Sequence, residues 1–143
     1  MAPPLKILFM CVANSARSQL AEGLAKDLFG DRAQVESAGS RPSSVNALAI
    51  EALKESGIDI SHHHSKATDD LPPGFLAGLD YVITLCAEEV CPLVTSNARK
   101  LHWPLPDPAG HEGLSHEEKL RLFRATRDAI KAKLTEFEKD LKR

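Results

Sequence analysis

Hydrophobic positions along the chain form short continuous runs that alternate with longer stretches of helical spacing. Mainly apolar runs of strand length occupy residues 5–10 and 79–85, as expected for strands that are covered on both faces. Weaker strand patterns lie at residues 34–38 and 100–103. The first run contains Lys6 and no basic leader precedes it, so it predicts a buried strand rather than a signal peptide.

Three amphipathic helices are predicted between and after these strands. Apolar residues recur every three or four positions within residues 15–29, 45–56 and 115–141. A glycine directly follows each of the first two stretches and marks its end. The third opens with a capping-box sequence at Ser115.

Strands that alternate with helices indicate βαβ units and a parallel sheet. The predicted fold class is therefore α/β, with a small doubly wound sheet of four parallel strands and helices on both faces. We expect one domain over residues 1–143. In such sheets, ligands bind beyond the carboxyl ends of the strands, at the switch point of the topology.

Composition and charge narrow the function classes. The 143 residues are 43% hydrophobic and 27% charged, which is ordinary for a globular protein and excludes collagen-like or coiled-coil rods. The formal charge is −2 and only 5% of residues are aromatic, so we expect neither a nucleic acid nor a membrane as partner. Three cysteines in a chain of this size favour a reducing cytoplasm, with thiols kept for chemistry. A monomer without cofactor or bound metal is expected.

The candidate chemistry begins where the first strand ends. A loop that leads into a helix directs backbone N–H groups at one spot, where the helix dipole also favours an anion. The predicted oxyanion-binding residues are those of this loop: Val12, Ala13, Asn14, Ser15, Ala16, Arg17 and Ser18. Arg17 adds a planar guanidinium that suits a tetrahedral oxyanion.

Cys11, at the start of this loop, is the candidate nucleophile. The donors that bind an oxyanion would also stabilise its thiolate, and Ser18 could donate a hydrogen bond to the sulfur. Asn14 tolerates left-handed backbone, while Ala13 must avoid it. The alternative is a buried, inert Cys11 with a solvated Arg17. The strand–loop–helix context favours the reactive site.

Two later segments add candidate groups. Asp107 stands between two prolines, which hold it on a stiff arm as either a general acid or a turn residue. Cys86 ends the second strong strand. If Cys11 and Cys86 follow adjacent parallel strands, their backbones lie about 4.8 Å apart, within the range that a disulfide spans. The alternatives are a buried strand-end thiol for Cys86 and an inert loop thiol for Cys91.

The strand, the Cys-x5-Arg-Ser loop and the helix resemble the low-molecular-weight protein tyrosine phosphatase fold. Within it, the chain is most similar to the arsenate reductases that draw electrons from thioredoxin. The similarity covers nearly the whole chain, and the matching parts are residues 11–22, 37–39, 57–61 and 107–108, and Cys86 with Cys91.

This resemblance implies an order of steps. Arsenate, or phosphate or sulfate in its place, occupies the loop, Cys11 attacks arsenic, and Asp107 protonates the departing oxygen. Cys86 then attacks Cys11, arsenite leaves, and Cys91 attacks Cys86. Thioredoxin or another dithiol reduces the last disulfide. If residues 87–91 are helical in the reduced protein, the last exchange must unwind them, so hydrogen exchange there should rise on oxidation.

Two further features are weighed against plainer interpretations. Residues 62–64 are three consecutive histidines, but consecutive side chains point in different directions, which disfavours a metal site, and the resemblance implies a loop there. In some relatives an Asn, a Glu, a Ser and a later Asp bind potassium. Asn14, Glu22 and Ser37 match, whereas Lys66 stands in place of the Asp, and we expect its ammonium to take the place of the ion.

The rival function is a small tyrosine phosphatase, in which water completes turnover at Cys11. That branch usually carries a second cysteine directly before the loop arginine, where this chain has Ala16. It also favours aromatic residues after the Asp-Pro pair, where this chain has Ala109 and Gly110. A module that senses oxyanions or redox state without turnover is an alternative of another class.

Overall fold

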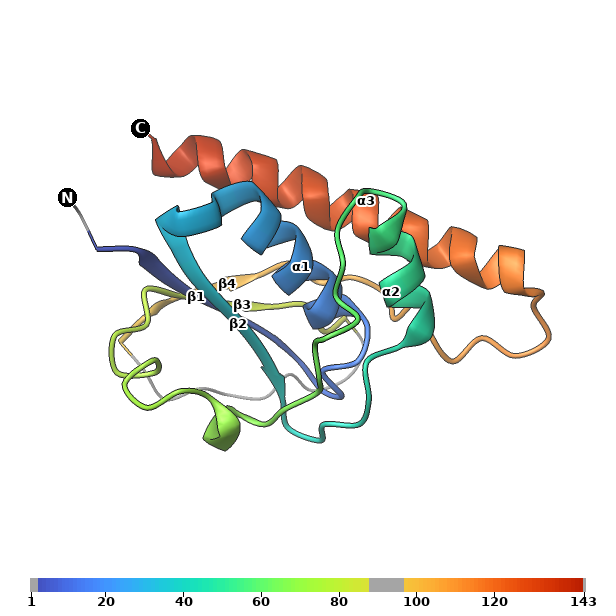
Figure 1. Ribbon diagram of the computed structural model, residues 1–143, viewed down its shortest axis with the longest axis horizontal. Coiled ribbons are helices and arrows are strands. Elements are labelled where there is room, and N and C mark those ends of the chain that lie inside the picture. The colour runs from blue at the N-terminus through green and yellow to red at the C-terminus, as the bar shows by residue number, and fades with distance from the viewer. Residues whose placement is uncertain (1–2, 88–96, 143) are drawn as a thin grey trace.

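The computed structural model describes residues 3–87 and 97–142 and contains the predicted sheet. Its strands are β1 (Leu5–Cys11), β2 (Ala33–Gly39), β3 (Tyr81–Thr84) and β4 (Arg99–His102). They lie in the order β2-β1-β3-β4, and each neighbouring pair is parallel (Figure 1). The chain passes from β1 to β2 on one side of β1 and later crosses to β3 on the other side. The strand order therefore reverses between β1 and β3, and the switch point lies at the carboxyl ends of these two strands. The predicted α/β class is confirmed. Cys91 and most of the expected 87–91 helix lie outside the described residues.

The helices follow the predicted stretches with shifted ends. They are α1 (Arg17–Phe29), α2 (Ala47–Lys54) and α3 (His116–Leu141). The Asn46 side chain accepts a hydrogen bond from the backbone of α2, and Ser115 caps α3 with the predicted capping box. Two one-turn 3₁₀ helices, η1 (Gly30–Arg32) and η2 (Thr68–Asp70), complete the order. Figure 1 shows α3 running beside α1 and α2, with both chain ends at one end of the molecule.

The two faces of the sheet are covered unequally, which differs from the predicted arrangement of helices. Alternate residues of β1 point to opposite faces: Ile7 and Phe9 join a core with all three α-helices, whereas Leu8 and Met10 face a smaller core. That smaller core is closed by residues 71–79, which follow the 3₁₀ helix η2. The segment contains two prolines and two glycines, which prevent a long helix there.

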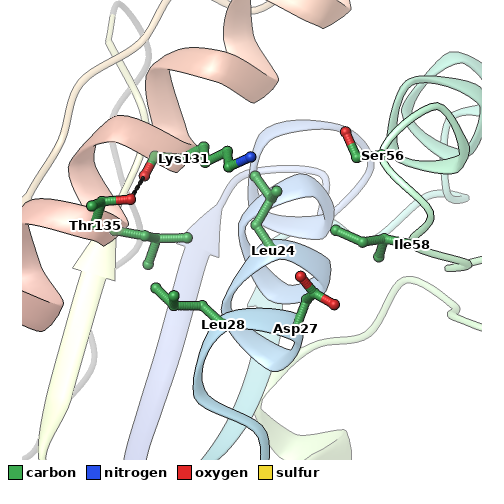
Figure 2. A pocket seen from close by; sticks show the side chains of 8 residues that line it. Leu24, Asp27, Leu28, Ser56, Ile58, Lys131 and Thr135 are labelled. Atoms are coloured by element: carbon green, nitrogen blue, oxygen red, sulfur yellow. Dashed lines mark hydrogen bonds between the residues drawn. The ribbon is translucent and has the colours of Figure 1, made fainter.

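A hollow of about 90 Å³ lies between α1, α3 and the chain after α2 (Figure 2). It is lined from α1 by Leu24, Asp27 and Leu28, so it adjoins the second half of that helix. The candidate chemistry lies at the other end of α1, where the helix begins. Across the described ranges, no helix has the length and apolarity needed to cross a membrane.

Candidate active site

The loop between β1 and α1 is held from outside by backbone hydrogen bonds. Three of its carbonyl oxygens accept N–H groups of the segment 41–46 at 2.9 to 3.0 Å, namely those of Val12, Ala13 and Ser15. In a trans peptide unit the carbonyl and the following N–H point in opposite directions. The N–H groups that follow these carbonyls therefore point away from the segment 41–46. The same contacts explain why α1 begins at Arg17, two residues later than predicted.

The N-terminus of α1 carries no side-chain cap. The N–H groups of its first turn have no acceptor within the helix, and together with the helix dipole they form a place where an anion is stabilised. The predicted position of the anion site, at the switch point and the helix start, therefore agrees with the geometry of the loop.

Asn14 ties the loop together. It is fully buried and is the one non-glycine residue with positive φ in the described chain, at 49°, as its predicted tolerance of left-handed backbone allows. Its Oδ1 accepts hydrogen bonds from the Lys66 backbone and from Gln19, both at 3.0 Å. Its Nδ2 donates to Ser18 at 2.8 Å and to Ser37 at 2.9 Å. Because a backbone N–H can only donate, the Lys66 contact fixes which end of the amide is oxygen.

These contacts leave Ser18 able to donate a hydrogen bond to Cys11. The Cys11 sulfur lies 2.8 Å from the Ser18 hydroxyl oxygen, and both side chains are buried. Ser18 accepts a hydrogen bond from Asn14, and its own O–H can donate to a thiolate at Cys11. Ser18 is therefore placed to stabilise a Cys11 thiolate, as the sequence predicts. Cys11 carries a free thiol.

Arg17 joins the loop to two later segments. Its side chain is buried and donates to the backbone carbonyls of Leu85 at 3.3 Å and Leu105 at 2.9 Å. One guanidinium nitrogen lies 3.9 Å from a carboxylate oxygen of Asp107, which is half exposed. The other Asp107 oxygen accepts the backbone N–H of Ala109 at 3.0 Å. Asp107 thus forms a turn and also lies beside Arg17.

Cys86 lies just beyond β3, the strand that pairs with β1. The pairing continues past the strand, because the Leu85 N–H donates to the Met10 carbonyl at 3.0 Å. The expectation that Cys11 and Cys86 follow adjacent parallel strands is confirmed. Cys86 is 1% exposed and takes part in a disulfide bond. Cys91 belongs to the part of the chain that is not described.

Behind the loop lies a buried carboxylate, Glu22, with two ammonium groups. Lys66 Nζ is 3.4 Å from one oxygen and Lys26 Nζ is 2.6 Å from the other. Ser37 donates to the first oxygen, and Glu36 lies 3.7 Å from Lys66. Burial alone would raise the pKa of Glu22, but Lys66, Lys26 and Ser37 outweigh it, and the pKa falls below its usual value. As expected, the Lys66 ammonium lies beside Glu22.

The three consecutive histidines do not act as a unit. His62 and His64 are exposed, whereas the side chain of His63 is 5% exposed. Its Nδ1 lies 3.0 Å from the Gln19 oxygen, and its Nε2 lies 3.8 Å from Glu22. No group of three or more potential metal-ligating side chains occurs among residues 3–87 and 97–142. Residues 62–64 lie outside the helices and strands, in the loop that was predicted.

Gln19 is the residue of this region that the sequence analysis overlooks. It is fully buried and donates to both oxygens of Asn14, at 3.2 Å to the backbone and 3.0 Å to the side chain. Ser65 donates to the same Asn14 backbone oxygen at 2.6 Å. One signal was present in the sequence. Gln19 and Glu22 are three residues apart, so they lie on one face of the predicted helix.

Gly39, the last residue of β2, leaves room for the loop. A Cβ atom at this position would lie 2.4 Å from the Val12 carbonyl oxygen and 2.9 Å from the Asn14 nitrogen. We expect Gly39→Ala to displace the loop backbone, to lower stability by about 1–3 kcal/mol and to weaken sulfate binding measured by calorimetry. Ser40→Ala, a change at an exposed neighbour, is the matched control. Unchanged sulfate affinity in Gly39→Ala would contradict this account of the loop.

The chain matches known proteins over most of its length. Residues 6–143 match the family of low molecular weight phosphotyrosine protein phosphatases. An arsenate reductase of Halalkalibacterium halodurans is 44% identical over 133 residues, which are 92% of this chain and 93% of the relative. A solved arsenate reductase in its phosphate-binding state is 35% identical, with a TM-score of 0.76 over 93% of this chain and 95% of that one.

A third relative links the fold to a reductant. The thioredoxin-dependent arsenate reductase of Corynebacterium glutamicum is 30% identical with a TM-score of 0.68, and the match covers 98% of this chain and 65% of that one. The family match, the parallel sheet and the loop that joins Cys11 to α1 agree with one another. The chain belongs to the low molecular weight phosphotyrosine protein phosphatase family.

Proposed function

We propose that this protein is an arsenate reductase in which Cys11 is the nucleophile and Cys86 and Cys91 form a disulfide relay that a dithiol protein regenerates. The observation that carries the proposal is the position of Cys86, directly after the strand that pairs with the strand of Cys11. An anion-binding loop, an arginine and a general acid would serve a phosphatase as well as a reductase, so they do not distinguish the two activities. A second thiol at the neighbouring strand end is what a reductase needs.

Binding comes first. The backbone N–H groups of the loop and the Arg17 guanidinium hold a tetrahedral oxyanion, because several donors there converge on one small volume. Phosphate and sulfate have the same shape and charge as arsenate, so they compete for the loop. The phosphate-binding state of a relative supports this.

The covalent step follows at Cys11. Its thiolate, stabilised by Ser18, attacks arsenic and forms a sulfur–arsenic bond, while an oxygen leaves as water after Asp107 supplies a proton. Cys86 then attacks the Cys11 sulfur. The sulfur–arsenic bond breaks, its electron pair stays with arsenic, arsenic(V) becomes arsenic(III), and a Cys11–Cys86 disulfide forms.

The relay then moves the disulfide away from the nucleophile. Cys91 attacks Cys86, which frees the Cys11 thiol for another arsenate. A dithiol protein of the thioredoxin class then reduces the disulfide between Cys86 and Cys91. The thioredoxin dependence of the Corynebacterium glutamicum relative supports this choice of reductant.

One assay tests the proposed function against the rival. Arsenite release is measured with thioredoxin, thioredoxin reductase and NADPH, in parallel with hydrolysis of an aryl phosphate. We expect many arsenite molecules per enzyme and slow ester hydrolysis. Rapid ester hydrolysis without arsenite release would identify a phosphatase instead. Tight oxyanion binding with neither activity would identify a sensing module.

Asp107 has its own test. Asp107→Asn keeps the oxygen that accepts the Ala109 N–H but removes the acid, so the rate of the chemical step should fall on the order of 10²–10⁴-fold, with arsenate affinity much less changed. Single-turnover kinetics separate the two quantities. Glu112→Gln changes an exposed carboxylate five residues further on and is the matched control. A nearly unchanged rate in Asp107→Asn would leave Asp107 as a turn residue.

A further inference from the structure

A chain of hydrogen-bonded side chains runs from His63 to Cys11. His63 Nδ1 lies 3.0 Å from the Gln19 oxygen, and the Gln19 nitrogen donates to Asn14 Oδ1 at 3.0 Å. Asn14 donates to Ser18 at 2.8 Å, and Ser18 lies 2.8 Å from the Cys11 sulfur. Gln19, Asn14 and Ser18 are completely buried. The mechanism above uses only the last two links of this chain.

The directions of the links from His63 to Ser18 follow from the donors and acceptors at their ends, and Ser18 donates to Cys11 when the sulfur is a thiolate. The Gln19 nitrogen donates to both oxygens of Asn14 and lies 3.3 Å from the His64 carbonyl, so its oxygen faces His63. An amide oxygen can only accept, and therefore His63 carries a proton on Nδ1. Burial lowers the pKa of His63 to about 4, so the ring is neutral at physiological pH and its Nε2 is unprotonated.

We propose that Gln19 and His63 are positioning residues for the Cys11 nucleophile. The Nδ1–H of His63 holds the Gln19 amide in one orientation, and that amide holds both oxygens of Asn14. Asn14 in turn keeps the loop in its left-handed turn and leaves the Ser18 proton for the Cys11 sulfur. The inference rests on the proposed nucleophilic role of Cys11.

Reversal of the Gln19 amide shows why its orientation matters. With nitrogen and oxygen exchanged, the Gln19 oxygen would face two Asn14 oxygens and the His64 carbonyl, and none of these can donate. The Asn14 side chain and its strained turn would lose their support. The Nδ1–H of His63 adds to these acceptors in holding the observed orientation, because without it the buried Gln19 oxygen would lose the donor that it faces. The side chain of His63 therefore acts on Cys11 through two amides and the Ser18 hydroxyl.

A matched pair of variants tests the proposal. His63→Leu removes the donor, whereas His63→Gln supplies an amide N–H in its place. Both are made with Cys86→Ser and Cys91→Ser, so that Cys11 is the one thiol left for alkylation by iodoacetamide across a pH range. His63→Leu should slow alkylation at neutral pH about tenfold, the equivalent of one lost hydrogen bond, and shift the curve to higher pH. His63→Gln should restore most of the rate.

Gln19→Glu provides a second test should His63→Leu fold poorly. It keeps size and shape but cannot donate to Asn14, so alkylation should slow at least as much and sulfate should protect Cys11 less well. His64→Leu changes an exposed side chain and keeps the carbonyl that Gln19 contacts. This variant should not change the pH dependence of Cys11 alkylation.

Two results would overturn the proposal. If the variants lower the melting temperature but leave the pH dependence of Cys11 alkylation unchanged, His63 and Gln19 contribute only to packing. An equal loss in His63→Leu and His63→Gln would show that the donor is not what matters. Neither measurement uses arsenate, so failure of the proposed function appears separately, as arsenite turnover that survives Cys11→Ser.

Discussion

Cys11→Ser is expected to abolish arsenate reduction and any hydrolysis of phosphate esters. A serine hydroxyl in this position is a far weaker nucleophile than a thiolate, and it cannot form the disulfide that reduces arsenic. The loss should be on the order of 10⁴-fold or more, close to the detection limit. Arsenite release and aryl phosphate hydrolysis measure the two activities.

Oxyanion binding provides the control for this variant. The N–H groups of the loop and Arg17 remain, and a hydroxyl at residue 11 can still pair with Ser18, so sulfate affinity should stay within a few fold of the wild type. Loss of binding together with activity would mean that the variant loop is misfolded. Substantial activity of either kind in a folded variant would exclude Cys11 as the nucleophile.

Cys91→Ser is expected to limit the enzyme to one arsenite per molecule. Cys86 can still attack Cys11, because the two residues follow paired strands, but the resulting disulfide has no further thiol to accept it. Multiple turnover with thioredoxin should therefore stop after a single burst. Mass spectrometry of a digest should find the Cys11–Cys86 disulfide in the trapped protein.

Cys86→Ser is the matched comparison. Without Cys86 the first disulfide cannot form, so not even the single burst of arsenite is expected. Both variants should keep the slow hydrolysis of aryl phosphate, which needs only Cys11, the loop and the acid. Normal arsenate turnover in both would refute the relay and favour the phosphatase assignment.

The sequence by itself determined the scaffold and the reactive groups. Continuous apolar runs and helical spacing are local patterns that reflect burial on two faces or one, so all four strands and three helices are found close to their predicted positions. The loop chemistry was equally local. Cys11 and Arg17 are joined by six residue steps between a strand and a helix, and Asn14 adopts the left-handed backbone that its side chain tolerates.

Only the tertiary structure decided which distant groups complete the site. Gln19 and His63 are 44 residues apart in the chain, and nothing in local spacing shows that a loop brings one buried ring to one buried amide. The meeting of Arg17 with Asp107 likewise depends on where β3 and β4 end. The unequal covering of the sheet has the same origin. The spacing of apolar residues shows which side of a helix is buried. Which face of the sheet that helix covers is set by the crossovers and by packing.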